Sequence, residues 1–327
     1  MKAWQIARLG EPGDVLELAD LPDPQPEPGR LVVRVLAAAA NFPDVLMCRG
    51  HYQIRPELPF TPGVELCGEI VAVGSGVTGF AVGDRVIGTA SLPHGGFAEM
   101  AVMDAADAQP APPALDDAAA AAFHIAYQTG WFGLHRRAAL RRDETLLVHA
   151  AAGGVGSAAV QLGKAAGARV IAVVGGPGKV EVARGLGADI VVDRSQEDFV
   201  EVVREATGGR GADVIYDPVG GDSYDRSTKC VAFEGRILVV GFAAGRIPAP
   251  ALNHALVKNY SIVGLHWGLY KQKDPASVWD CHLELTALAE SGALAPLIGA
   301  KLALADVPDG LTRLAEGRTV GRVVFQP

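Results

Sequence analysis

The stretch His149–Gly176, HAAAGGVGSAAVQLGKAAGARVIAVVGG, decides the fold class of this 327-residue chain. An apolar run that ends at Val148 precedes it, and the glycine-rich turn leads into an alanine-rich segment and a second apolar run, RVIAVV. This order predicts a strand, a turn, a helix and a second parallel strand. The turn matches the dinucleotide-binding fingerprint with alanine in the first position, at Ala151, Gly153 and Gly156.

The glycines of this turn suit the binding of a pyrophosphate. Gly153 and Gly154 have no side chains, so the backbone approaches the phosphates closely, and Gly156 lets the helix pack against the strand. The N-terminus of that helix supplies amide donors and partial positive charge. We predict cofactor binding by Ala151, Gly153, Gly154, Val155 and Gly156. The alternative is an ordinary glycine turn.

The acidic residue that usually follows such a turn is missing. About 20 residues on, a carboxylate ordinarily accepts hydrogen bonds from the adenosine ribose, but here the second apolar run ends in Gly175 and Gly176. Gly175 leaves space for a 2′-phosphate, and Lys179 and Arg194 lie just beyond as candidate phosphate partners. The pattern favours NADPH over NADH. The alternative is that Lys179 and Arg194 are solvated surface cations.

The rest of the chain predicts two domains of different kinds. Short β-rich runs broken by Gly and Pro, such as residues 29–41 and 65–88, suggest a barrel or sandwich in the first third. The middle alternates strands with helices, which predicts a Rossmann-type, doubly wound parallel sheet in an α/β fold. The final strand, GRVVFQ, is suited to rejoin the first domain's sheet. We expect a catalytic domain at 1–123, a nucleotide-binding domain at 124–264 and a C-terminal segment at 265–327 that returns to the catalytic domain.

Composition and charge narrow the class of protein. The formal net charge is −8 and there is no lysine or arginine run, which makes nucleic acid and anionic membrane surfaces poor partners. No stretch is long and apolar enough to span a bilayer, and the first residues contain no apolar signal core. The four cysteines are far apart in sequence, which fits reduced thiols and predicts a cytoplasmic location.

Several motifs in a fixed order carry a resemblance to a known family. They include ANFPDVLMCRGHYQ at 40–53, GDRVIG at 83–88, AYQTGW at 126–131, HAAAGGVG at 149–156 and DPVGG at 217–221. Over nearly its whole length the chain resembles the medium-chain dehydrogenase/reductase superfamily, most closely its zinc-free quinone oxidoreductase branch. The resemblance implies a GroES-like β-rich catalytic domain, an inserted nucleotide-binding domain, a cofactor cleft between them and a homodimer.

The resemblance allows each zinc-ligand position of zinc-dependent relatives to be compared with the residue found in this chain. Zinc-dependent relatives have a cysteine where this chain has Asn41, and a Gly-His-Glu motif where it has Gly63-Val64-Glu65. The four-cysteine loop of a structural zinc site is missing as well. One other set of donors is present, although its spacing matches no known zinc pattern: Cys48, His51, Glu65 and Cys67. We predict no metal site.

A chain without zinc lacks the Lewis acid that polarises a carbonyl in alcohol–ketone chemistry. Hydride transfer to a quinone or an activated enone does not need one, because conjugation spreads the incoming charge onto a distal oxygen. We therefore expect an NADPH-dependent reductase of quinones or α,β-unsaturated carbonyls. The alternatives are an enoyl-thioester reductase on the same scaffold and a weakly catalytic NADPH-binding protein.

By resemblance, Asn41, Asp44 and Tyr52 face the nicotinamide and form the candidate catalytic set. Tyr52 is a hydrogen-bond donor or proton relay to the acceptor, or else a rim aromatic that only shapes the pocket. Asn41 orients the nicotinamide amide or the substrate carbonyl, or else forms a turn before Phe42. We interpret His51 as a polar loop residue, because nothing in the sequence identifies an orienting partner for a general base.

Three further segments are expected to line the cofactor. Thr129 matches the family's nicotinamide-side contact, and Gly241 and Phe242 match its cofactor-lining segment. Leu265, with His266 and Trp267, is expected at the far wall of an aromatic pocket suited to a flat acceptor. For Trp267, the alternative is an ordinary core aromatic.

Overall fold

The computed structural model describes all residues, Met1–Pro327, and the chain divides into two compact units. The first unit combines Met1–Ile125 with Ala295–Pro327, and the second unit is Ala126–Leu294. The predicted first boundary, after residue 123, lies close to the observed one. The predicted C-terminal segment at 265–327 differs from the structure, because residues 265–294 belong to the second unit and only the remainder returns to the first.

Residues 265–294 join the second unit through polar contacts with the segment that opens it. The indole Nε1 of Trp267 donates to Oε1 of Gln128 at 3.0 Å, and Arg136 forms an ion pair with Asp274 at 2.7 Å. The elements involved are α4 (His124–Trp131), the π-helical turn η1 (Phe132–Arg137), α10 (Gly268–Lys273) and α11 (Pro275–Glu290). A helical sequence pattern does not indicate which core a helix packs against, which explains the difference from the predicted boundary.

The first unit is built on a seven-stranded, mostly antiparallel sheet in the order β14-β15-β3-β4-β5-β7, with β6 also paired to β3. Its strands are β3 (Arg30–Ala39), β4 (Glu65–Val73), β5 (Arg85–Thr89), β6 (Met100–Asp104), β7 (Gln109–Pro110), β14 (Ile298–Ala303) and β15 (Arg322–Gln326). The hairpin-like pair β1 (Lys2–Ile6) and β2 (Leu16–Asp20) lies beside it. The helices are α1 (Pro12–Val15), α2 (Phe42–Cys48), α3 (Asp117–Ala121) and α12 (Val307–Ala315), with the 3-10 turn η3 (Leu304–Asp306).

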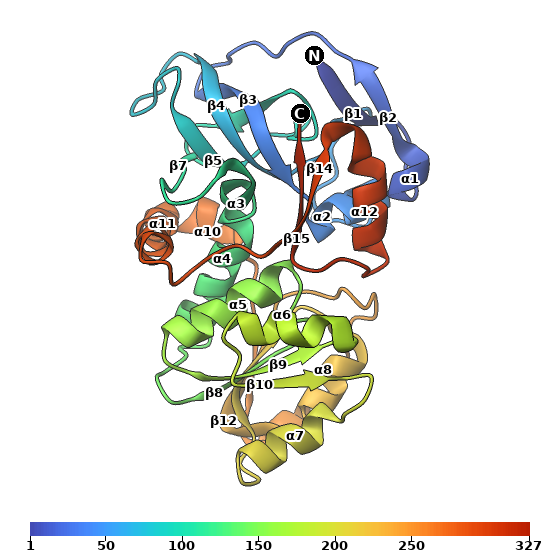
Figure 1. Cartoon of the computed structure of the whole chain (residues 1–327), viewed down its shortest axis with the longest axis vertical. Helices are drawn as coiled ribbons and strands as arrows, with labels where there is room; N and C mark the ends of the chain where they lie inside the picture. Colours follow the sequence, from blue (N-terminus) through green and yellow to red (C-terminus); the bar gives the residue numbers. More distant parts are fainter. The chain divides into compact units, whose positions relative to one another are not determined.

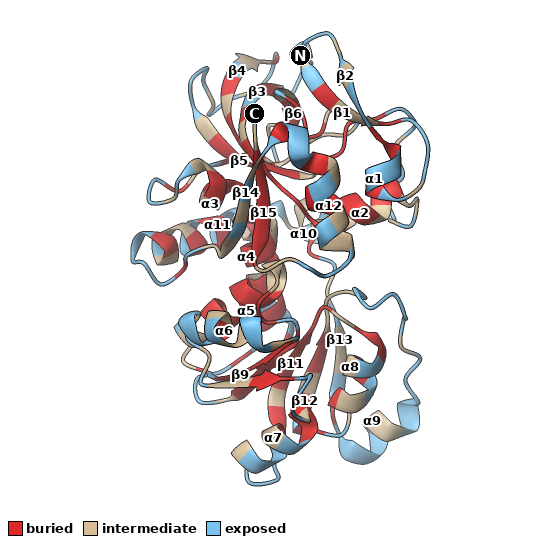
Figure 2. Cartoon of the chain, turned by 45° about the vertical axis from the view of Figure 1, so that its right-hand side comes forward, coloured by how far each residue is buried: buried red, intermediate tan, exposed pale blue.

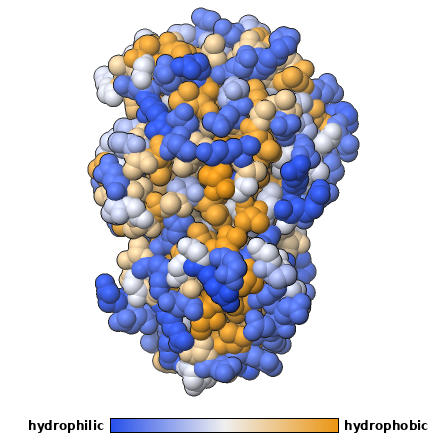
Figure 3. Space-filling view, in the orientation of Figure 1, coloured by the Kyte–Doolittle hydropathy of each residue, from blue (hydrophilic) through white to orange (hydrophobic).

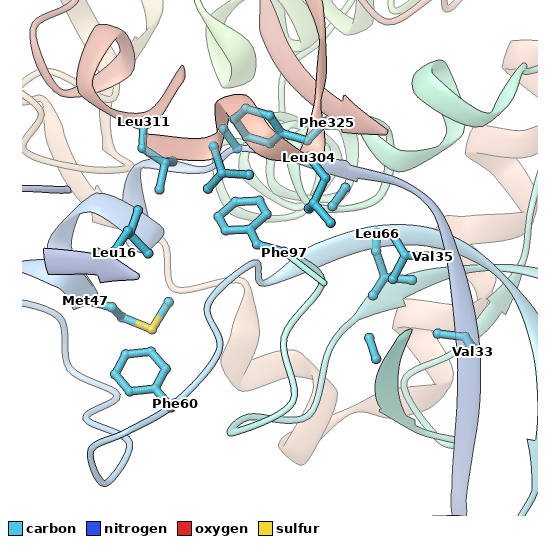
Figure 4. Packing of buried hydrophobic residues seen from close by; sticks show 14 of the residues in the cluster. Leu16, Val33, Val35, Met47, Phe60, Leu66, Phe97, Leu304, Leu311 and Phe325 are labelled. Atoms are coloured by element: carbon cyan, nitrogen blue, oxygen red, sulfur yellow. The ribbon is translucent and has the colours of Figure 1, made fainter. Parts of the chain in front are cut away.

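The C-terminal strand closes the core of the first unit. β15 pairs with β3, with Val324 opposite Ala39 and Phe325 opposite Ala38, so the prediction that the last strand rejoins the first domain's sheet is confirmed. The ring of Phe325 meets Phe97 edge-on, with ring centroids 5.3 Å apart (Figure 4). Both rings are fully buried, so the two ends of the chain share one hydrophobic cluster.

The second unit contains the predicted doubly wound sheet. Six parallel strands lie in the order β10-β9-β8-β11-β12-β13, and the order reverses between β8 and β11. They are β8 (Thr145–Val148), β9 (Arg169–Val174), β10 (Ile190–Asp193), β11 (Ala212–Asp217), β12 (Val231–Val239) and β13 (Ser261–Gly264). Helices α5 (Gly154–Ala165) and α6 (Val180–Gly185) cover one face, and α7 (Phe199–Ala206) and α8 (Gly221–Ser227) cover the other (Figure 1). Ligands of such sheets bind at the carboxyl ends of the strands, near the reversal.

Burial follows this architecture. The central strands of the parallel sheet are buried, while α9 (Leu252–Lys258) has no buried residue (Figure 2). No helix combines the length and apolar character needed to cross a membrane. Hydrophilic side chains are spread across the face drawn in Figure 3, with smaller apolar areas between them.

Candidate active site

The glycine turn has the close packing at Gly156 that the sequence predicts. It opens at Ala150, which has a φ of 50°, and the amide of Gly153 donates to the carbonyl oxygen of Ala150 at 2.8 Å. A Cβ added to Gly156 would lie 2.2 Å from the same oxygen, so only glycine fits there. The predicted phosphate-binding residues thus form one turn and the start of α5, whose first amides lack intrahelical acceptors.

Two cations flank the end of β9. A Cβ added to Gly175 would lie 3.1 Å from Nε of Arg194, so any larger side chain would displace that guanidinium. Lys179 lies in the 3-10 turn η2 (Pro177–Lys179) and is half-buried. Burial lowers the pKa of Lys179, and the positive charge of Arg194 lowers it further. The two cations therefore interact electrostatically, which is the arrangement that an anionic ligand stabilises.

His149, the residue before the glycine turn, was given no role by the sequence analysis. It is buried, and its Nε2 lies 2.8 Å from Oγ of Ser227 on α8. The Ser227 hydroxyl donates to the carbonyl of Ser223, so His149 is assigned as the donor to Ser227, with its proton on Nε2. Its ring also meets Phe199 edge-on at 4.9 Å. The residue before the glycine turn is thereby attached to both α7 and α8.

Burial keeps His149 neutral. It lowers the pKa of His149 from its ordinary value of 6.5 to about 3, and the nearby positive charges of Arg194 and Arg226 lower it further. A neutral imidazole supplies one donor and one acceptor, which matches its single bond to Ser227.

The loop after β11 lies against the predicted cofactor-lining segment. Oδ1 of Asp217 accepts from the amides of Val219 and Gly220 at 2.8 and 2.9 Å. Gly220 has a φ of 68°, and a Cβ there would lie 2.9 Å from the ring of Phe242. The structure therefore brings Gly241 and Phe242 next to this loop, at the carboxyl end of the parallel sheet.

The residues of the second unit that are expected on the nicotinamide side make the following contacts. Thr129 lies on α4 and is 9% exposed, next to Gln128, which accepts from Trp267. Trp267 is buried and hydrogen-bonded, so it has the environment of a core aromatic. Leu265 is half-buried and its amide donates to Val239 at the end of β12.

In the first unit, Asn41 is the centre of a buried polar network. Its amide nitrogen donates to the carbonyl of Ala39 at 3.1 Å and to Oε2 of Glu65 at 2.9 Å, while its oxygen accepts from Nη1 of Arg322 at 2.9 Å. Arg322 also forms an ion pair with Glu65. Both amide donors of Asn41 are used within the protein, so a ligand would meet a fixed side chain with one remaining acceptor lone pair.

Glu65 and Arg322 are functional candidates that the sequence analysis did not assign to the cofactor or the acceptor. Both are buried, and Glu65 also accepts from the amide of Ile125 at 2.7 Å. Burial raises the pKa of Glu65, and the guanidinium of Arg322 opposes that rise. Their separation in sequence leaves no local signal for this pairing.

Asp44 is fully buried and accepts three backbone hydrogen bonds. Its donors are the amides of Asn41 at 2.8 Å and of Gly63 and Val64, each at 3.1 Å. Burial raises the pKa of Asp44 to about 7, an effect that these amides and Arg322 oppose. Asp44 therefore holds the start of α2 against the segment before β4.

Tyr52 follows α2 and is half-buried against the core of the first unit. Burial raises the pKa of its phenol, and the negative charge of Asp44 raises it further, so the hydroxyl stays protonated at neutral pH. His51, beside it, is exposed. Of the predicted catalytic set, Asn41, Asp44 and Tyr52 thus share one region of the first unit.

The four alternative metal donors do not assemble. No group of three or more His, Cys, Asp or Glu side chains is placed to hold a metal ion. Cys48 and Cys67 are buried, and burial raises the pKa of each thiol to about 12. Cys48, His51, Glu65 and Cys67 are therefore not placed together as the ligands of one metal ion.

Two models of known protein families match the chain, one in each unit. The family model of the alcohol dehydrogenase GroES-like domain matches residues 27–113, and that of zinc-binding dehydrogenase matches residues 154–284. The chain is 39% identical over 295 residues to the quinone oxidoreductase-like protein 2 homolog of Nematostella vectensis, covering 90% of this chain and 80% of that protein.

Two further similarities bear on the chemistry. The Escherichia coli quinone oxidoreductase complexed with NADPH superposes with a TM-score of 0.93 at 30% identity, covering 100% of both chains. The chain is also 40% identical over 237 residues to the phthioceranic/hydroxyphthioceranic acid synthase of Mycobacterium tuberculosis (strain ATCC 25618 / H37Rv). That match covers 72% of this chain and 11% of the synthase.

The neutral state of His149 predicts a pH dependence of stability. Its pKa of about 3 in the folded protein lies below the ordinary 6.5, so only the unfolded chain gains a proton between those values, and stability falls as pH drops. We expect His149 to lower the free energy of unfolding by about 1.4 kcal/mol per pH unit between pH 6 and 4. His149→Gln, which keeps a donor toward Ser227, removes that slope in urea unfolding at several pH values. Parallel curves for the two proteins would contradict the assignment.

Proposed function

The chain belongs to the quinone oxidoreductase family of the medium-chain dehydrogenase/reductase superfamily, and from this premise we propose that it reduces quinones or α,β-unsaturated carbonyls with NADPH and without zinc. The observation that carries the proposal is the pair of cations that follow β9 and β10. There, the guanidinium of Arg194 lies against Gly175, which has no side chain to exclude it, and the positive charge of Arg194 acts on Lys179.

The cofactor assignment rests on three features of the second unit. The glycine turn and the first amides of α5 suit a pyrophosphate. Arg194 and Lys179 suit a 2′-phosphate, which NADH lacks. The E. coli relative that superposes over the whole chain was solved with NADPH. The fit of these residues supports NADPH as the resident cofactor.

The proposed roles in the first unit follow from its protonation states. When bound, NADPH supplies the hydride from C4 of its nicotinamide. The protonated phenol of Tyr52 donates a hydrogen bond to the acceptor oxygen, and Tyr52 or water gives it the proton that completes the two-electron reduction. Asn41 and Asp44 position this region, since their hydrogen bonds hold β3, α2 and β4 together.

Zinc independence is proposed from the donor chemistry. Asn41 offers a carboxamide and Val64 offers no donor where zinc-dependent relatives have Cys and His. Glu65, the remaining member of that motif, is bonded to Arg322 and Asn41. The residues present therefore do not fit a zinc ion, although one family model bears the name of zinc-binding dehydrogenases.

A second candidate substrate class is an enoyl thioester. The similarity to a segment of an acid synthase favours it, since reduction of an activated acyl chain uses the same hydride transfer to a conjugated double bond. A weakly catalytic NADPH-binding protein is the third candidate. The three candidates share the NADPH pocket and differ in the acceptor.

We also propose a homodimer formed through the edge strand β13. One edge of β13 is unpaired in the sheet, which leaves backbone donors and acceptors available to a second copy. Apolar side chains flank this edge, with Phe233 68% and Leu256 76% exposed. A twofold pairing of identical strands would cover both features at once.

The phosphate pocket can be tested by charge removal. Lys179→Ala and Arg194→Ala are each expected to raise KM for NADPH about 10- to 100-fold and to change KM for NADH little, because only NADPH presents the 2′-phosphate. Lys229→Ala, which removes an exposed lysine elsewhere on the second unit, serves as the control. Equal effects of Lys179→Ala on both cofactors would contradict the assignment.

An acceptor panel tests the reaction class. NADPH oxidation is expected with 1,4-benzoquinone, 9,10-phenanthrenequinone and simple enones, and EDTA treatment is expected to leave the rates unchanged, with no stoichiometric zinc by elemental analysis. A preference for crotonyl-CoA would move the assignment to enoyl thioesters. Background rates on every acceptor would leave a binding protein as the function.

The dimer proposal predicts that one charge introduced beside the edge of β13 separates the two copies. The wild-type protein is expected to show twice the chain mass of 33.9 kDa by light scattering after size exclusion. Leu256→Asp is expected to give the monomer mass, whereas Val82→Asp, at a comparably exposed apolar residue of the first unit, leaves the dimer intact. A monomeric wild type, or a dimer that tolerates Leu256→Asp, would refute the interface.

A further inference from the structure

An acidic side chain next to the proposed phosphate site has no role in the chemistry proposed above. Asp193 is the last residue of β10, and it pairs in register with Val174, the last residue of β9. Gly175, where a carboxylate is missing, follows directly. The sequence has no acidic residue at the end of β9, but Asp193 places one at the end of the neighbouring strand β10.

Asp193 connects the two loops that follow β9 and β10. Its Oδ1 accepts from the amide of Gly176 at 2.9 Å, and from the amide and hydroxyl of Ser195 at 2.9 and 2.8 Å. Gly176, with a φ of 101°, follows β9, and Ser195 follows β10. One carboxylate oxygen therefore fixes the backbone on both sides of Gly175.

The other carboxylate oxygen of Asp193 accepts no hydrogen bond from the protein. Oδ2 of Asp193 is buried and has no hydrogen-bond partner. Hydrogen bonds from Ser195 lower the pKa of Asp193, and Arg194 lowers it further, so the carboxylate is ionised at neutral pH. A negative charge therefore lies near Arg194, one of the two cations proposed to bind a 2′-phosphate.

We propose that Asp193 is a positioning residue that limits the preference of this site for a 2′-phosphorylated dinucleotide over one with a free 2′-hydroxyl. The proposal rests on the NADPH function proposed above. The hydrogen bonds of Asp193 hold Gly176 and Ser195 in place for either ligand, while its charge repels the 2′-phosphate. The segment around the ends of β9 and β10 thus carries one negative charge, on Asp193, as well as the positive charges of Lys179 and Arg194.

Binding of two adenosine probes separates these effects from catalysis. In titration calorimetry of the full chain, Asp193→Asn keeps an acceptor oxygen and removes the charge, so the Kd of 2′,5′-ADP is expected to fall about three- to tenfold. The Kd of 5′-ADP is expected to change less than twofold, and added salt should shrink the difference. Asp193→Ala removes the acceptor as well and is expected to weaken both ligands.

Glu197→Gln is the matched control, since it removes one negative charge from an exposed side chain four residues away. It is expected to leave both Kd values unchanged. If Asp193→Asn weakens both probes by one factor, or changes neither, the residue has no selective role and the inference is overturned. If the wild type binds the two probes equally, the NADPH assignment itself fails, which distinguishes failure of the proposed function from failure of the inference.

Discussion

The buried ion pair between Arg322 and Glu65 is the constraint on which the first unit depends. Arg322 begins the C-terminal strand β15, and Glu65 begins β4, far earlier in the chain. Taking two charges out of water is costly unless hydrogen bonds satisfy most of their remaining donors and acceptors, and breaking such a pair typically costs about 3–5 kcal/mol. Nε of Arg322 is buried without a hydrogen-bond partner. Asn41 and the amide of Ile125 supply the further hydrogen bonds to Glu65. The network fixes the start of α2, and with it Asp44 and the neighbourhood of Tyr52.

The second unit forms its proposed phosphate turn with backbone atoms rather than with charged side chains. Its phosphate turn has no polar side chain aimed at a ligand, and the selective element is the approach of α5 to Ala150, which excludes any Cβ at Gly156. His149 directly precedes that turn and is held in place by a hydrogen bond with Ser227 and a ring contact with Phe199. Because burial keeps the imidazole neutral, this support adds no charge beneath the pyrophosphate that the turn is proposed to bind.

The sequence was a good guide where the signal is local. The strand–turn–helix order around Gly153 and the apolar alternation predicted the parallel sheet, and the last strand returned to the first sheet as expected. Pairings between distant residues could not be predicted, because neither Glu65 nor Arg322 has a pattern that identifies its partner. The same limit applies to residues 265–294, whose helical period fits either core. The position of Asp193 could not be predicted either, because only the pairing of β10 with β9 brings it opposite Val174, the residue before Gly175.

The two units differ in how they use charge, and the difference follows from what each is proposed to bind. Around Asn41, Arg322 and Glu65 pair with each other through short-range bonds, so the charges of this buried region are held by protein groups rather than by a ligand. At the end of β9, Arg194 and Lys179 instead repel one another, so the free protein holds an electrostatic cost that a dianionic phosphate relieves. A site that is slightly unfavourable when empty gains selectivity for the ligand that removes the repulsion, since a 2′-hydroxyl cannot do so. The carboxylate of Asp193 reduces that cost in the empty site, and the same charge must reduce the gain on binding.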